Sequence, residues 1–168
     1  MHAPHPPESI QIECPDELAT EALAHRLASM PALRNLTIWL HGDLGAGKTT
    51  WVRHLLRGLG VTGRIKSPTY AIVELHEAQP GPAWPEGLAI AHFDFYRFSD
   101  PREWEDAGFR ELLAGPGLKL VEWPEKAGAL LRSPDLDIHI DTVNPQARLF
   151  RIGAGSRAGQ SILREWSK

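Results

Sequence analysis

Apolar residues occur along this chain in short clusters whose spacing alternates between the period of strands and that of helices. Residues 10–13 alternate apolar and polar side chains, and residues 36–40 form a continuous apolar run, as buried strands do. Residues 51–59 place their apolar side chains on one helix face, and Gly58 and Gly60 signal the end of that helix. The other predicted elements are a helix from residue 15 to about residue 30, strands at 70–75, 88–95 and 118–123, a helix at 101–113, strands at 136–140 and 148–152, and a closing helical segment at 162–166.

Strands that alternate with helices indicate an α/β layer structure, in which a mostly parallel central sheet is flanked by helices. The two closing strands, at 136–140 and 148–152, can pair with each other as an antiparallel edge of this sheet. A chain of 168 residues is long enough for one domain with its own core. We therefore expect a single domain over residues 10–168, preceded by a flexible tail at residues 1–9.

The segment between the apolar run at 36–40 and the next helix matches Gly-x-x-x-x-Gly-Lys-Thr over residues 42–49. Glycines permit positive φ angles, which let backbone N–H groups curl around phosphate oxygens, and the following helix adds its positive N-terminal end. In this pattern Lys48 contacts the β- and γ-phosphates and the Thr49 hydroxyl binds Mg²⁺. The dinucleotide-binding pattern has a different glycine order. The sequence therefore predicts a P-loop NTPase fold that binds a nucleoside triphosphate.

Two acidic residues end buried strands of the predicted sheet. Asp94 follows the apolar run at 88–93, and Glu122 follows the run at 118–121. The carboxyl ends of parallel strands meet at the ligand crevice, so both acids could reach one metal ion. Nucleotide hydrolysis needs a carboxylate that holds Mg²⁺ or orients water. Each acid can also be only the solvated end of a strand, and the sequence leaves open whether Asp94 is a base, a metal ligand or a positioning group.

Three more residues each have more than one interpretation. Thr69, within Ser-Pro-Thr-Tyr, is either a hydroxyl that senses the γ-phosphate and the metal or part of a plain turn. Trp123, directly after Glu122, can stack on a base, face a partner or pack in the core. Arg97 can pair with an acid or contact phosphate charge.

Composition narrows the class of partner and the compartment. The net charge is −3 and no basic stretch is present, so direct binding to nucleic acid is not favoured. The single cysteine, Cys14, permits no internal disulfide and fits a reducing cytoplasm. Neither a membrane span nor a signal peptide is indicated. The eight histidines show no zinc-ligand spacing, and we expect packing or supporting roles for His41 and His92.

Four segments occur in an order that closely resembles the TsaE family. They are residues 41–50 (HGDLGAGKTT), 66–70 (KSPTY), 92–97 (HFDFYR) and 121–124 (VEWP). The glycine loop alone is shared by many families, whereas the other three segments together are specific. The resemblance covers roughly residues 10–155. Members of this family are bacterial ATPases needed for the threonylcarbamoyladenosine (t6A) modification of tRNA.

The resemblance implies a site for ATP and Mg²⁺ and assigns residues to it. Mg²⁺ would be held by Thr49, Glu122 and Asp94, and the two acids would also be catalytic. Arg148 is a further candidate near the nucleotide. The residues expected to bind the nucleotide are Gly42, Asp43, Gly45, Ala46, Gly47, Lys48, Thr49, Thr50, Thr69 and Trp123.

The resemblance also implies a function. The chain would hydrolyse ATP slowly to drive turnover of the TsaB–TsaD heterodimer, which transfers the threonylcarbamoyl group, and would meet tRNA only through that complex. The residues alone leave two alternatives, a small-molecule kinase and a nucleotide-dependent binding module. Such kinases usually carry an arginine-bearing lid, and no compact arginine-rich segment follows the central strands. We therefore expect a cytoplasmic, partner-stimulated ATPase.

Overall fold

The computed structural model describes residues 9–100, 102 and 108–168. The predicted tail at residues 1–9 thus lies outside the described residues except for Ser9, which begins the first strand. Residues 101 and 103–107 of the predicted helix at 101–113 also lie outside them, and its described end forms the short helix α4 (Phe109–Ala114).

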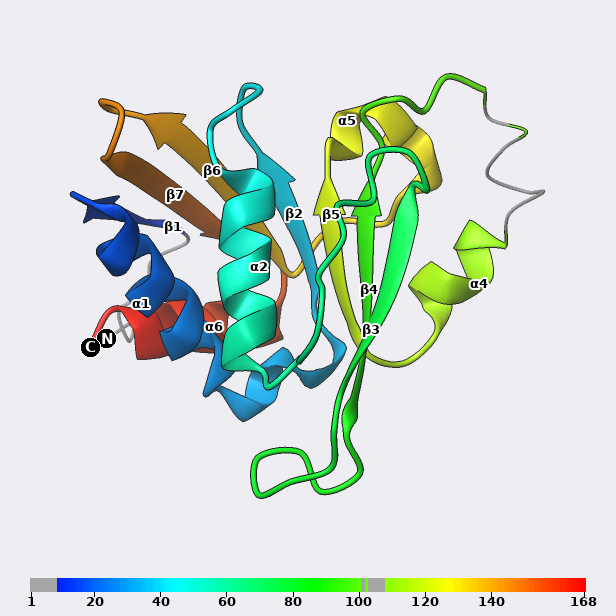
Figure 1. Ribbon diagram of the computed structural model, residues 1–168, viewed down its shortest axis with the longest axis horizontal. Coiled ribbons are helices and arrows are strands. Elements are labelled where there is room, and N and C mark those ends of the chain that lie inside the picture. The colour runs from blue at the N-terminus through cyan, green and yellow to red at the C-terminus, as the bar shows by residue number, and fades with distance from the viewer. Residues whose placement is uncertain (1–8, 101, 103–107) are drawn as a thin grey trace, which may run out of the picture.

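Seven strands form one mixed sheet with the spatial order β1-β7-β6-β2-β5-β4-β3 (Figure 1). The four central strands β6, β2, β5 and β4 are parallel, and antiparallel strands extend the sheet at both edges. The α/β class and the antiparallel edge are confirmed, with a second antiparallel edge at β3. The strands are β1 (Ser9–Cys14), β2 (Thr37–His41), β3 (Val73–Ala78), β4 (Leu88–Asp94), β5 (Leu118–Glu122), β6 (Leu136–Thr142) and β7 (Arg148–Ala154).

Helices cover both faces of this sheet. Buried side chains of the three longer helices pack with residues such as Leu40 and Leu120 in the main core, whereas α4 and α5 contribute to a smaller core around Phe93 and Val121. Figure 1 shows α1 and α2 lying next to each other over the sheet. The helices are α1 (Glu17–Ala28), α2 (Lys48–Gly58), α4, α5 (Pro124–Ala127) and α6 (Arg157–Trp166), with 3₁₀ turns η1 (Pro31–Asn35) and η2 (Gly128–Leu130).

Side-chain caps decide where two of the helices begin. Asp16 caps α1, because its carboxylate accepts a hydrogen bond of 2.8 Å from the backbone N–H of Ala19. Ser156 caps α6 in the same way through the N–H of Gly159, at 3.1 Å. The closing helix therefore starts well before residue 162, where the apolar pattern alone placed it.

The strand predicted at residues 70–75 is shifted toward the C-terminus. The backbone N–H of Ile72 donates to the carbonyl of Pro68 at 2.6 Å, and Ile72 itself has a φ of 69°. This turn occupies the start of the predicted strand, so β3 begins at Val73 and reaches Ala78, where it pairs with Leu88. No helix among the described residues is long and apolar enough to cross a membrane.

Candidate functional site

The glycine loop joins β2 to α2 at the edge where the central strands end (Figure 1). Gly42 has a φ of 155°, and a Cβ there would lie 2.8 Å from the carbonyl oxygen of Ile140. Gly47 has a φ of 104° and precedes the first residue of the helix. Side chains are strained or excluded at both positions, so the glycines let the backbone turn tightly into the N-terminus of α2.

Lys48 is folded back over this loop. Its Nζ donates hydrogen bonds to the carbonyl of Gly42 and, at 3.1 Å, to that of Asp43. Nζ also lies 4.3 Å from the centre of the Trp123 ring, which attracts a cation. Burial lowers the pKa of Lys48, although Glu122 and Asp94 oppose this effect. The ammonium of Lys48 is thus held, nearly buried, on the inner side of the glycine loop.

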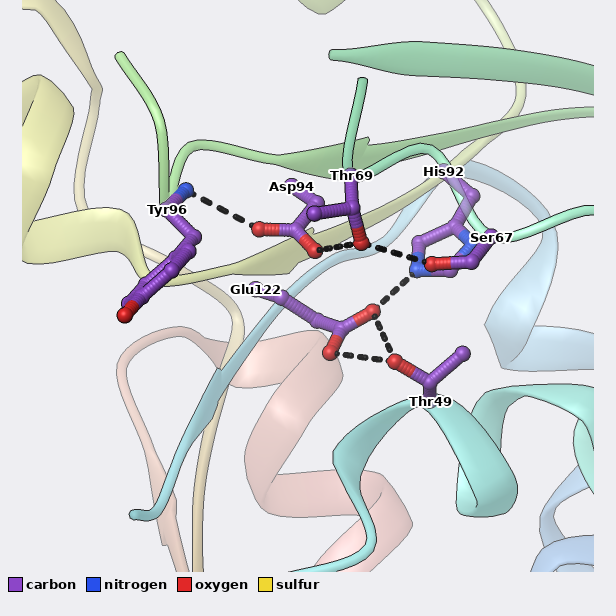
Figure 2. Close-up of polar contacts among 7 residues, drawn as sticks. All are labelled: Thr49, Ser67, Thr69, His92, Asp94, Tyr96 and Glu122. Atoms are coloured by element: carbon purple, nitrogen blue, oxygen red, sulfur yellow. Dashed lines mark hydrogen bonds and ion pairs between the residues drawn. The ribbon is translucent and has the colours of Figure 1, made fainter. Parts of the chain in front are cut away.

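The first turn of α2 contacts the end of β5 through Thr49 and Glu122. The Thr49 hydroxyl lies 2.9 and 3.1 Å from the two carboxylate oxygens of Glu122, which is 1% exposed (Figure 2). His92 Nε2 lies 2.6 Å from Glu122 Oε2, and His92 Nδ1 has no partner among the described residues. In a neutral imidazole this arrangement places the proton on Nε2, where it donates to the carboxylate and fixes its orientation.

Asp94 stands beside Glu122 on the neighbouring strand. The two residues are direct partners in the parallel β4–β5 register. Asp94 accepts hydrogen bonds from the backbone N–H of Tyr96 at 2.9 Å and from the Thr69 hydroxyl at 3.2 Å (Figure 2). The Thr69 hydroxyl also contacts that of Ser67, at 2.8 Å. The loop after α2 is therefore connected to the acid at the end of β4.

Burial raises the pKa of Asp94, the nearby charge of Glu122 adds to the rise, and the hydrogen bonds from Tyr96 and Thr69 oppose it. A carboxyl whose pKa is higher in the folded chain favours folding only while it is protonated. Its contribution is fully present below the unfolded value, near 3.8, and is lost as the pH rises through the folded value. At neutral pH, ionised Asp94 therefore lowers the free energy of unfolding.

The Asp94→Asn variant should consequently be more stable than the wild type at neutral pH. We expect its Tm to be a few degrees higher at pH 7.5, with the difference shrinking as the pH approaches 4, because the substitution removes the buried charge. The amide oxygen can still accept from the Tyr96 N–H, and the amide NH₂ can donate to the Thr69 oxygen. Thermal unfolding followed by circular dichroism checks this. Asp100→Asn removes an exposed charge and serves as the control. A wild type that stays more stable at pH 7.5 would contradict this account of Asp94.

Trp123 has an unusual backbone conformation for a bulky residue. Its φ and ψ are 54° and 49°, in the left-handed region, directly before Pro124 at the start of α5. This conformation costs on the order of 1–3 kcal/mol outside glycine. It turns the indole ring toward Lys48 and toward Tyr96, whose ring centre is 5.1 Å away. The sheet end thus holds an aromatic ring against the buried ammonium.

Two cavities meet at the glycine loop. One, of about 410 Å³, is lined by Lys48, Thr49, Thr69, Asp94, Glu122 and Trp123. The other, of about 570 Å³, lies between the loop, the start of α1 and the β6–β7 turn. Gly45, Gly47 and Thr50 line both cavities. The glycine loop therefore borders two neighbouring cavities, and the charged side chains of Lys48, Asp94 and Glu122 line only the smaller one.

The remaining predicted residues take different places around this space. Arg148 donates from Nε to the carbonyl of Ala46 at 2.8 Å, so β7 supports the loop. Arg97 lies over the Tyr70 ring, 4.5 Å from its centre, and donates a hydrogen bond of 3.4 Å to the Tyr70 hydroxyl. Among the described residues it forms no ion pair with an acid. Gly42 and Asp43 line a third cavity beyond the loop.

Two residues of the site were not identified as such from the sequence. His92 was expected only in a packing or supporting role, and Tyr96 was not considered. His92 lies two residues before Asp94 on the same strand, and this spacing already placed both side chains on one strand face.

Comparisons with known proteins agree with one another. Residues 14–150 match the family model described as "Threonylcarbamoyl adenosine biosynthesis protein TsaE". The chain is 35% identical over 164 residues to the tRNA threonylcarbamoyladenosine biosynthesis protein TsaE of Haemophilus influenzae, covering 95% of this chain and 99% of the relative. It is 34% identical to the protein of the same name from Bacillus subtilis, covering 89% and 88%. The crystal structure of Bacillus subtilis YdiB superimposes with a TM-score of 0.70 at 26% identity, covering 95% and 94% of the two chains.

Proposed function

The chain belongs to the TsaE family of t6A biosynthesis proteins, and we propose that it is a Mg²⁺-dependent ATP hydrolase that drives turnover of the TsaB–TsaD complex. The observation that carries this proposal is the convergence of one cation and three oxygen-bearing side chains on a single cavity. Lys48, Thr49, Asp94 and Glu122 all line the space of about 410 Å³ beside the glycine loop. Phosphoryl-transfer sites of P-loop enzymes use these residue types for the phosphates and the metal.

The glycine loop supplies the phosphate site of the proposal. Lys48 exchanges its carbonyl partners for phosphate oxygens, and the N–H groups at the start of α2 face the same charge. The neighbouring cavity of about 570 Å³ is large enough for the nucleoside. It adjoins the phosphate side, because Gly45, Gly47 and Thr50 line both cavities. Its lining includes Leu18 and Phe150, which offer apolar surface to a base.

The oxygen donors suit Mg²⁺, which prefers hydroxyl, carboxylate and water ligands. Thr49 and Glu122 are already in contact, and Asp94 is the register neighbour of Glu122. When bound, the metal supplies positive charge that neutralises the phosphates. His92 keeps Glu122 oriented, and Thr69 keeps Asp94 in place. Asp94, nearest the loop that carries Thr69, is the group that we propose to orient the attacking water.

The open edge of the site favours a protein partner. Leu44 in the glycine loop is 67% exposed and Tyr70 is 83% exposed, so two large apolar side chains face solvent beside the catalytic cavity. Exposed apolar surface next to a site is typical of protein docking. A partner that covers this edge would exclude water from the phosphates, which strengthens every charge interaction there. Without the partner, water reaches the phosphates, and we therefore expect the chain alone to hydrolyse ATP slowly.

Affinity capture of TsaB–TsaD by the tagged chain tests the partner directly. We expect capture with ATP and Mg²⁺ to exceed capture without nucleotide, because the phosphate charge orders the loops that carry Leu44 and Thr69. A Tyr70→Ser variant should weaken capture while it keeps ATP binding, because Tyr70 is 83% exposed and does not line the cavity beside Lys48. Equal capture by wild type and variant would contradict docking at this edge. Transfer of the γ-phosphate to a small acceptor without partners would instead support the kinase alternative.

A further inference from the structure

A second group of side chains of metal-ligand types lies where the end of β2 adjoins the first half of β6. His41 and His139 are direct partners in the parallel β2–β6 register, and Asp137 pairs with the residue two positions before His41. All three side chains therefore project from one face of the sheet. The pair His41 and Asp137 is 96 residues apart in sequence, which explains why no zinc-ligand spacing is visible in the chain.

The ligand atoms of these three residues already converge. His41 Nε2 lies 2.5 Å from Asp137 Oδ1, and His139 Nε2 lies 3.7 Å from Asp137 Oδ2. The two imidazole rings are stacked, with centres 4.3 Å apart and planes at 9°. One atom from each residue falls within 4.8 Å of the others. Tetrahedral ligands at about 2.0–2.1 Å from Zn²⁺ are roughly 3.3 Å from one another. Because an imidazole binds a metal in the plane of its ring, one of the two stacked rings must turn out of the stack when the ion binds.

A fourth residue supports one of the histidines from behind. His41 Nδ1 lies 3.6 Å from Glu125 Oε2 on α5, while its Nε2 faces Asp137. Histidines that bind metals commonly direct their second ring nitrogen at a carboxylate, which fixes the tautomer and the ring orientation. The distance of 3.6 Å between His41 Nδ1 and Glu125 Oε2 is that of an ion pair and is longer than a hydrogen bond. Glu125 thus adds an observation that is independent of the three converging ligands.

We propose that His41, Asp137 and His139 bind a divalent transition-metal ion of the zinc class. Two imidazoles and one carboxylate are the ligands that Zn²⁺ accepts when one position stays open. A cavity of about 400 Å³ adjoins the cluster at His139 and Glu125 and reaches Gly42 and Asp43. His41 directly precedes Gly42, so a bound ion fixes the start of the glycine loop. The proposal does not rest on ATP hydrolysis.

Titration of the metal-free, full-length protein with Zn²⁺ alone tests the site. Isothermal titration calorimetry should show one ion per chain, and Co²⁺ should give the visible absorption of a tetrahedral site with histidine ligands. We expect Asp137→Asn and His139→Gln to weaken binding by about 100-fold or more, and Glu125→Gln by about tenfold. Wild-type circular dichroism in the variants establishes that they fold.

The control is His54→Gln, because His54 also lies beside two carboxylates, those of Glu17 at 3.2 Å and Glu21 at 3.9 Å. It should leave the affinity for Zn²⁺ unchanged. The proposal is overturned if the wild type binds no stoichiometric Zn²⁺, or if the folded Asp137→Asn and His139→Gln variants bind it as tightly as the wild type.

Discussion

Replacement of Lys48 by methionine is expected to abolish measurable ATP binding. Lys48 is 5% exposed, and its ammonium is held by two loop carbonyls and the Trp123 ring, at the place where the loop would receive phosphate. Loss of one partner of a buried charge pair costs about 2–5 kcal/mol, and 3 kcal/mol is roughly a hundredfold in Kd. Equilibrium titration with a fluorescent ATP analogue measures the change.

Methionine keeps the packing of the lysine stem, so the loss of binding should come without unfolding. Because burial lowers the pKa of Lys48, the buried charge is itself unfavourable, and the variant without nucleotide should be at least as stable as the wild type. Lys126→Met removes an equivalent charge from an exposed position on the nearby helix α5 and should bind ATP normally. Unchanged affinity in a folded Lys48→Met protein would remove the assignment of the phosphate loop.

Replacement of Glu122 by glutamine should stop hydrolysis more than it weakens nucleotide binding. The carboxylate contacts the Thr49 hydroxyl and His92 Nε2 from the end of β5, and it is the acid nearest the proposed metal position. The glutamine amide keeps the size of the side chain but loses the charge that we propose to hold Mg²⁺. We expect the rate to fall by at least about 10²-fold, while the Kd for ATP without Mg²⁺ changes little.

Steady-state phosphate release and its Mg²⁺ dependence measure this effect. Glu86→Gln changes an exposed glutamate in the β3–β4 connection and should leave both values unchanged. If Glu122→Gln hydrolyses ATP at the wild-type rate and with the same Mg²⁺ dependence, then Glu122 is a structural residue and the metal site lies elsewhere.

Local patterns were enough to predict the parts of the site that each depend on one short segment. The glycine loop was predicted because its residues are contiguous, and the strand ends at Asp94 and Glu122 because apolar runs stop there. The adjacency of these two acids then followed from parallel strands sharing an edge. The shift of β3 was missed, because the turn at Ile72 depends on a backbone hydrogen bond that the apolar pattern does not reveal.

Features that need strand register or side-chain direction could not be predicted. Trp123 faces Lys48 only because its backbone adopts a left-handed conformation. The proton position on His92 depends on which of its nitrogens meets Glu122. The cluster of His41, Asp137 and His139 forms only when β6 is placed beside β2 in one particular register. A shift of that register by one residue would turn Asp137 and His139 to the other face.

The rate of ATP hydrolysis by the purified chain, with and without TsaB–TsaD, tests the central claim most directly. The account predicts slow release of phosphate by the chain alone and a clear increase on addition of the complex. A group supplied in trans raises the rate by about 10³–10⁵ in other P-loop enzymes. The increase should be absent in the Lys48→Met and Glu122→Gln variants. A rate that TsaB–TsaD does not change, or hydrolysis that survives in both variants, would contradict the proposed function.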